Sequence, residues 1–163
     1  WTLTCQSCWG CKSMATIALI GCSKTKADQP CEAALMYKGQ LFTKSLAYAR
    51  LLTDDANIFI LSAKHHLLPL RAHIEPYNET LNDLNNMQRK WWASVVRQHL
   101  FNLYPPTLTP PLTVVFLCGR NYHEHIADHL PDTWEWSTPL SDAGGIGYQL
   151  QFLTDRLNES ETT

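Results

Sequence analysis

Apolar runs that end at polar or glycine-containing segments divide the chain into short elements. Three continuous apolar runs are typical of parallel strands covered on both faces, and they span residues 15–20, 57–61 and 113–117. The alternating pattern over 133–137 predicts a weaker edge strand. Apolar residues at helical spacing predict helices over residues 40–52, 84–103, 122–130 and 146–157. Because strands and helices alternate, we predict an α/β fold with a mostly parallel four-stranded sheet flanked by helices.

Length and composition predict a single compact domain. The chain has 163 residues, of which 45% are hydrophobic and six are tryptophan, so it can bury a substantial core. We place the domain at residues 14–157 and expect residues 158–163 to form a frayed polar tail. No apolar stretch has the length of a membrane span, so we predict no membrane partner.

The six cysteines do not suggest a disulfide framework. Cys22 and Cys118 fall at predicted strand ends without a secretory signal, which favours a reducing, cytoplasmic compartment. A CxxCxxC cluster near the start of the chain consists of Cys5, Cys8 and Cys11. Zinc needs four ligands, and Cys31 or a histidine would have to supply the fourth. We therefore expect no metal or other cofactor, and we interpret residues 1–13 as a leader or disordered extension outside the fold.

Polar segments follow the predicted strands directly, so they lie at the carboxyl ends of strands, where open α/β sheets bind ligands. The first segment is Cys22-Ser23-Lys24-Thr25-Lys26. Its hydroxyl, ammonium and backbone N–H groups suit a phosphate or carboxylate, although the spacing of a Walker A loop is absent. Cys22 is either a nucleophile activated by a neighbouring lysine or a packing cysteine.

The second segment, residues 62–81, predicts a long functional loop without a helix of its own until its end. Its acid, base and hydrogen-bonding groups are Lys64, His65, His66, Arg71, His73, Glu75, Tyr77 and Asn78. Tyr77 and Asn78 suit stacking on a base and recognition of its edge, while the alternative for Tyr77 is simple closure of the core. The adjacent histidines do not have the i, i+4 spacing of a helical zinc site.

The remaining two segments predict supporting groups. Arg120 and Tyr122 stand at the start of a predicted helix, where a guanidinium can bind a phosphate and a tyrosine can stack. The segment around Asp142 has glycines that permit close approach of a ligand. Asp142 and Glu75 are therefore the two candidate carboxylates of the site.

The charges are unevenly distributed although the net charge is only −2. Residues 1–120 contain 12 lysines and arginines against 7 acidic residues, whereas residues 121–163 contain 1 against 8. A basic body of this kind favours contact with phosphates, because the local field steers a polyanion. Ordinary solvated surface charge is the alternative interpretation.

Two stretches of the second segment, ILSAKHHLLPL at 60–70 and IEPYNETL at 74–81, resemble a motif of the YaaA-like peroxide-stress proteins. They also resemble a related phage and bacterial family of unassigned domains, in which the first loop likewise reads Cys-Ser-x-x-Lys. The Leu35, Tyr37 and Phe42 pattern and the late Gly-Ile-Gly match that family as well, so the resemblance covers residues 17–157. His66, Asn78 and Asp142 depart from the families, which usually have glycine, aspartate and a small residue there.

The resemblance implies a compact α/β fold, association with DNA, and a likeness to enzymes that act at nucleobases, including the core of archaeosine synthase. On this basis we expect a hydrolase of the DNA glycosylase type that cleaves the N-glycosidic bond of an unusual or modified base, with a role in defence against phage DNA. The expected catalytic residues are Glu75 or Asp142 as the carboxylate, or Lys26 or Lys64 as a Schiff-base amine. The expected substrate-binding residues are Cys22, Ser23, Lys24, Tyr37, Phe42, His65, Tyr77, Asn78, Arg120 and Tyr122.

Two other functions remain open from the sequence. One is a DNA-binding stress protein without catalytic activity, and the other is a nucleotide hydrolase or base transferase that acts on small molecules. RNA or free nucleotides are therefore alternatives to DNA as the partner. The sequence does not predict the oligomeric state.

Overall fold

A five-stranded sheet forms the centre of the fold, which the computed structural model describes for residues 15–163. The predicted leader and the three clustered cysteines lie outside the described residues. The strand order is β4-β3-β1-β6-β7. The strands are β1 (Ala15–Gly21), β3 (Ile58–Ser62), β4 (His66–Pro69), β6 (Leu112–Leu117) and β7 (Glu135–Ser137).

The sheet is mostly parallel, as predicted, but it has five strands rather than four. β1 pairs in parallel with both β3 and β6, and β7 adds to β6 as a parallel edge strand. The additional strand, β4, is antiparallel to β3. All residues of β3 are buried, which explains why its sequence is a continuous apolar run rather than an alternating one.

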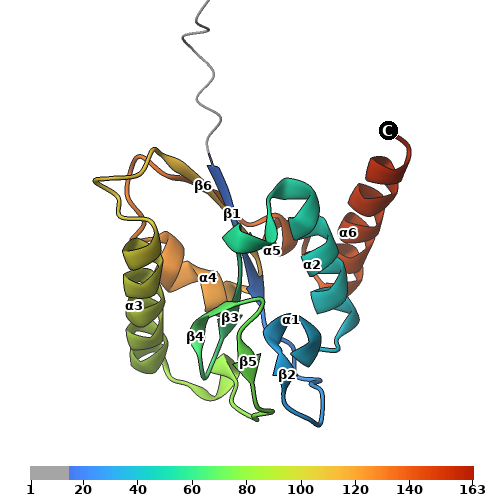
Figure 1. Ribbon diagram of the computed structural model, residues 1–163, viewed down its shortest axis with the longest axis horizontal. Coiled ribbons are helices and arrows are strands. Elements are labelled where there is room, and N and C mark those ends of the chain that lie inside the picture. Colours follow the sequence, from blue (N-terminus) through green and yellow to red (C-terminus); the bar gives the residue numbers. More distant parts are fainter. Residues whose placement is uncertain (1–14) are drawn as a thin grey trace, which may run out of the picture.

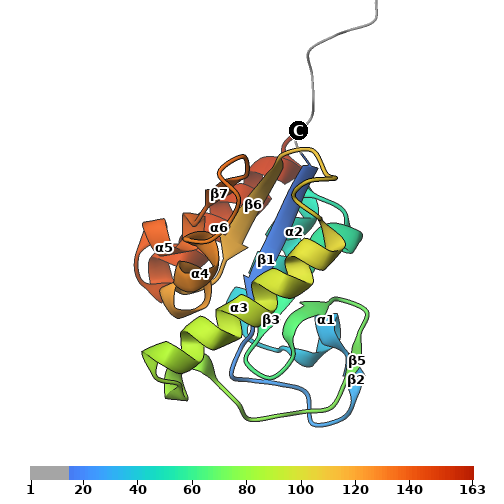
Figure 2. The ribbon, with the colours of Figure 1, turned by 90° about the vertical axis from the view of Figure 1, so that its left-hand side faces the viewer.

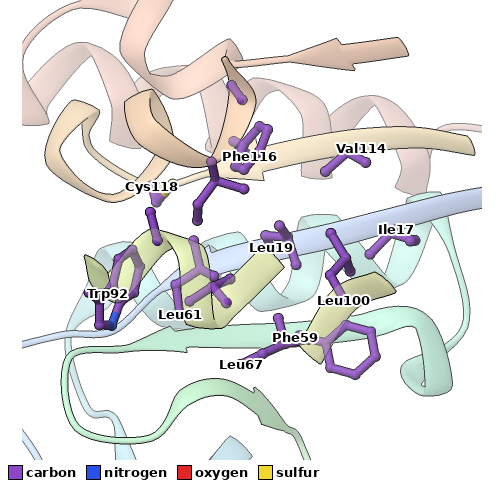
Figure 3. Packing of buried hydrophobic residues seen from close by; sticks show 14 of the residues in the cluster. Ile17, Leu19, Phe59, Leu61, Leu67, Trp92, Leu100, Val114, Phe116 and Cys118 are labelled. Atoms are coloured by element: carbon purple, nitrogen blue, oxygen red, sulfur yellow. The ribbon is translucent and has the colours of Figure 1, made fainter. Parts of the chain in front are cut away.

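Helices cover both faces of the sheet (Figures 1 and 2). On one face, α3 (Asn86–Leu103) and α4 (Arg120–Ala127) bury their apolar residues against the strands. Figure 3 shows this cluster, in which Trp92 of α3 lies near Leu61 and Cys118. The other face is covered by α1 (Ala33–Met36), α2 (Gln40–Leu52), α5 (Pro139–Ala143) and α6 (Ile146–Glu161).

The segment that the sequence predicted as one long loop, residues 62–81, is interrupted by two short strands, although it contains no helix until its end, as predicted. It contains β4, then β5 (His73–Ile74), which pairs with β2 (Cys31–Glu32) in a separate two-stranded sheet. A single 3₁₀ turn follows at Leu81–Asp83. Strands of two to four residues are too short to leave a recognisable period in the sequence.

The start of α3 has a clear local cause. α3 begins with a capping box, in which the Asn85 side chain accepts from the Gln88 backbone and the Gln88 side chain accepts from the Asn85 backbone. α6 continues to Glu161 instead of ending at residue 157, so most of the tail predicted to fray is helical. Within the described residues, no helix has the length and apolarity needed to cross a membrane.

Candidate functional site

Three of the four polar segments meet at one edge of the sheet, where the carboxyl ends of β1, β3 and β6 lie side by side. The strand register pairs Gly21 with Leu61 and Ile20 with Leu117. The backbone N–H of Cys22 donates to the carbonyl of Leu61, with an N–O distance of 3.3 Å. The segments that begin after β1, β3 and β6 are therefore neighbours, as the parallel-sheet argument predicts.

A network of three hydroxyl groups forms the centre of this edge. The Tyr77 hydroxyl lies 2.6 Å from the Tyr37 hydroxyl and 2.8 Å from Oγ of Ser62. Ser62 is fully buried, and its Oγ also accepts from the backbone N–H groups of Lys64 and His65, at 3.3 and 2.9 Å. A hydroxyl oxygen accepts two hydrogen bonds and donates one, so Ser62 donates its proton to Tyr77.

Burial keeps the phenols of this network protonated. It raises the pKa of Tyr37 to about 12, an effect partly opposed by the hydrogen bond with Tyr77. Burial also raises the pKa of Tyr77, and the negative charge of a Cys22 thiolate would raise it further. Both tyrosines are therefore neutral near pH 7 and act as hydrogen-bonding groups rather than as bases.

Positively charged and aromatic side chains surround the ring of Tyr77. Nζ of Lys26 lies 4.6 Å from the Tyr77 ring centroid, and Nζ of Lys64 lies 6.0 Å from it. The His65 ring stands edge-on to the same ring, with centroids 5.5 Å apart. Lys26 is held by a β-bridge with Tyr37. An aromatic surface flanked by two ammonium groups suits a planar ligand that carries phosphate.

The other side of the edge is formed by Cys22 and Tyr122, whose Sγ and hydroxyl oxygen are 3.3 Å apart. The Tyr122 ring stands edge-on to Trp92, with centroids 5.9 Å apart. Nε1 of Trp92 in turn donates to the carbonyl oxygen of Ser62 at 2.9 Å. Trp92 therefore connects the side of the site that contains Cys22 and Tyr122 to the hydroxyl network, because it contacts Tyr122 and the end of β3 at Ser62.

The fourth polar segment reaches the same edge through α5. Nε2 of His123 lies 3.0 Å from Oγ of Ser141, which donates to the Cys118 carbonyl at 3.4 Å. Burial lowers the pKa of His123, so the imidazole is neutral near pH 7. Asp142 is exposed, and its Oδ1 accepts from the Thr138 hydroxyl at 3.4 Å. No group of three His, Cys, Asp or Glu side chains that could hold a metal ion occurs within residues 15–163.

Comparison with known proteins gives one match. A family model described as a family of unknown function matches residues 17–155, which include nearly all of the fold and every residue of the site described above. The chain belongs to this family, DUF6884. No curated protein and no solved structure matches the chain.

Several candidate residues of this DUF6884 domain are not on an open surface. Tyr37 is only 2% exposed and Phe42 only 3%, and their ring centroids are 5.1 Å apart. They pack behind Tyr77 and support it instead of presenting a stacking surface. Ser23 has a local structural role, because its Oγ donates to the Thr25 carbonyl and accepts from the Gly39 N–H.

Other candidates of the DUF6884 domain are exposed. Glu75 and Asn78 lie on either side of Tyr77 in sequence, and both are exposed, as is Lys24. The side chain of Arg120 is 83% exposed and pairs with Glu124 at 3.0 Å, within α4. Arg120 therefore faces solvent next to the edge.

Sequence reasoning missed two residues that organise this DUF6884 site. Ser62 is the last residue of β3 and the first of a polar segment, and this position was the only indication in the sequence of its role. Trp92 follows the helical period of α3 like any core residue, and its indole hydrogen bond to Ser62 depends on tertiary packing alone.

Proposed function

We propose that this protein is a DNA glycosylase, with the reacting nucleotide bound against Tyr77 between Lys26 and Lys64. The observation that carries the proposal is the fixed, half-buried Tyr77 ring with an ammonium group 4.6 Å from its centroid and a second at 6.0 Å. An extruded base needs an aromatic surface, and the phosphates on either side of it need cations. Both are present on a sheet edge of the kind that binds ligands.

The reaction we propose breaks the bond between C1′ of the deoxyribose and the base nitrogen, and the bonding electrons leave with the base. The oxygen of a water molecule adds to C1′. A carboxylate takes one proton from that water, and the departing base nitrogen receives it. We assign the carboxylate first to Glu75, because it is exposed, lies two residues from Tyr77 and has no ion-pair partner among the described residues. Asp142 is the alternative.

Release of free base is the direct test. Purified protein is incubated with a panel of modified DNAs that includes phage DNA, and released bases are identified by mass spectrometry. We expect one class of base to be released by the wild type and by Glu135→Gln, an exposed carboxylate on β7. We expect Tyr77→Ala and Glu75→Gln to lose the activity. If the wild type releases no base from any of these DNAs, the proposal fails.

Borohydride trapping distinguishes water from lysine as the nucleophile. A Schiff base between a lysine and C1′ is reduced to a stable covalent adduct, whereas a water mechanism leaves none. Lys26→Met and Lys64→Met identify the lysine if an adduct forms. Arg71→Met is the matched control, because Arg71 lies beside Ile58 at the opposite, amino end of β3.

Two further measurements, turnover of free nucleotides and DNA binding as a function of salt, identify the other candidate functions. Faster turnover of free nucleotides than of DNA would indicate a nucleotide hydrolase or base transferase. Salt-dependent DNA binding without base release, unchanged in Glu75→Gln and Asp142→Asn, would indicate a DNA-binding stress protein.

A further inference from the structure

A groove opens beside the Tyr77 cluster, between the turn that joins β3 to β4 and the first half of α3. Its volume is about 540 Å³, and its walls include Lys64, His66, Glu79, Met87, Gln88 and Trp91. Met87 and Trp91 are 79% and 65% exposed, and they lie one helical turn apart, so both face the opening. Two large apolar side chains left exposed beside a cavity are typical of a binding surface.

The backbone of His66 is strained at the point where this residue lines the groove. Its φ of 62° makes it the only non-glycine residue with positive φ in the described part of the chain. Glycine is favoured in this left-handed region, because a Cβ is strained there. The imidazole stands edge-on to Trp91, with ring centroids 5.9 Å apart. Strain of this kind persists where the side chain is needed, and here the side chain lines the groove.

The groove and the Tyr77 cluster share the β3–β4 turn. Lys64 lines the groove, and its Nζ is also 6.0 Å from the Tyr77 ring centroid. Trp92 lines the groove as well and donates to the Ser62 carbonyl. Lys64 is therefore shared by the Tyr77 cluster and by the groove that Trp91 lines. Alternation of aromatic surfaces with cations is the arrangement that binds consecutive nucleotides of a single strand.

We propose that this groove, the Trp91 groove, binds a second nucleobase of a single-stranded DNA segment, linked through a phosphate at Lys64 to the nucleotide held against Tyr77. The identity of the neighbouring nucleotide rests on the proposed function. A nucleobase fits the groove because it is planar and largely uncharged, and it can stack on Trp91. Gln88 uses its Oε1 to cap α3, so its Nε2 is the donor that remains for a base edge.

The test measures binding and does not need base release. A short fluorescein-labelled oligothymidylate is titrated with protein at low, fixed salt, and anisotropy gives the affinity. We expect Trp91→Ala to weaken binding about 5- to 100-fold, the effect of removing one stacking aromatic. Trp91→Phe should restore most of the affinity. The matched control is Trp136→Ala on β7, because Trp136 is also exposed (46%) but does not line the groove.

A mononucleotide separates the two subsites. The inhibition constant of dTMP should be the same for the wild type and for Trp91→Ala, because a mononucleotide binds first at the Tyr77 site, where both ammonium groups lie within reach of its phosphate. The proposal is overturned if the wild type does not bind the oligothymidylate, or if Trp91→Ala and Trp136→Ala have the same effect. It is also overturned if Trp91→Ala changes the sedimentation mass, because a second copy of the chain then covers the groove.

His66→Gly is a variant in which weaker binding could not be explained by a loss of stability. Relief of the positive φ should raise the melting temperature by about 2 to 4 °C, while loss of the imidazole weakens oligothymidylate binding. A higher melting temperature with unchanged binding would contradict the role of His66. If the Trp91 effect is found but no modified DNA loses a base, the glycosylase proposal fails and the nucleobase subsite stands.

Discussion

Ser62 is the residue whose loss most directly tests the organisation of the candidate site. Its side chain is fully buried, and Oγ has three partners. It donates to the Tyr77 hydroxyl at 2.8 Å and accepts from the backbone N–H groups of His65 and Lys64 at 2.9 and 3.3 Å. The substitution Ser62→Ala removes all three hydrogen bonds and adds no atom. It leaves the two partly buried backbone donors of the β3–β4 turn, at Lys64 and His65, without their acceptor.

The expected loss in the free energy of unfolding is about 2 to 4 kcal/mol. A buried donor left without a partner costs roughly 1 to 3 kcal/mol, and the lost bond to Tyr77 adds roughly 1 kcal/mol. Ser45 is a matched control, because it is 1% exposed but its Oγ has no hydrogen-bond partner in the described part of the chain. Ser45→Ala should leave the free energy of unfolding unchanged or raise it by about 1 kcal/mol.

Urea unfolding followed by circular dichroism measures both variants. The midpoint for Ser62→Ala should fall while the slope m stays constant, because the surface exposed on unfolding does not change. In thermal unfolding the same loss corresponds to a decrease of about 4 to 16 °C in Tm. If the two serine variants differ by less than 0.5 kcal/mol, roughly the additivity error of such measurements, the hydroxyl network does not hold Tyr77 and the site geometry argued above is refuted.

Three further substitutions test the packing and the charge state of the fold. Gly21→Ala should lower the free energy of unfolding by about 1 to 3 kcal/mol, because the added Cβ would lie 2.9 Å from a side-chain carbon just beyond β6. Gly119→Ala is the control, because its Cβ would have no atom within 4 Å. The same urea assay should show nearly unchanged stability for this variant. Leu100→Ala, fully buried in α3, should cost about 2 to 5 kcal/mol, whereas Leu103→Ala, 56% exposed, should change stability by less than about 0.5 kcal/mol. Burial raises the pKa of Tyr37 to about 12, so the folded state keeps a proton that the unfolded chain loses near pH 10. The contribution of this protonated tyrosine to the free energy of unfolding is complete below pH 10 and falls by about 3 kcal/mol as the pH rises to 12. Urea unfolding across that pH range should show a smaller decrease in stability for Tyr37→Phe than for the wild type.

The central strands and the long helices could be predicted because burial leaves a strong pattern in the sequence. β3 is buried on both faces, so every residue from Ile58 to Leu61 is apolar. The period of α2 is equally clear, and the predicted range equals the observed Gln40–Leu52. β7 was recognised by its alternation and lies at the sheet edge as expected.

The elements that were missed are those that depend on contacts distant in sequence. β2 and β5 have only two residues each and exist because Cys31 pairs with Ile74. β4 begins at His66, whose left-handed backbone is signalled only by the glycine that the resembling families usually have at this position. A turn at this position is normally signalled by glycine. The five-stranded sheet therefore could not be distinguished from a four-stranded one by pattern alone.

For the site, the sequence predicted the correct edge of the sheet but not the roles of the side chains around it. The prediction that the polar segments follow the carboxyl ends of parallel strands placed Cys22, Ser62 and Cys118 near one another, as the structure does. It did not show that Tyr37 faces inward, because a tyrosine has the same signal whether its ring lines a pocket or its hydroxyl is satisfied in the core. The hydrogen bond between Tyr37 and Tyr77 settles that question.

The position of Tyr77 depends on the small β2–β5 sheet more than on the central one. Tyr77 follows β5 by three residues, and Tyr37 follows α1, which begins directly after β2. The two hydroxyl groups therefore meet where the segments of β2 and β5 are joined, by a ladder of two residue pairs and by backbone hydrogen bonds from Ala33 and Ala34 to the carbonyls of Ala72 and Leu70. So short a ladder contributes little stability of its own. The hydrogen bonds among the hydroxyl groups of Tyr37, Tyr77 and Ser62 hold the same segment at a second point. We expect a change that weakens this ladder to release Tyr77 and the Lys26 beside it while β1, β3 and β6 remain folded, which would couple local order in the small sheet to binding at the proposed Tyr77 site.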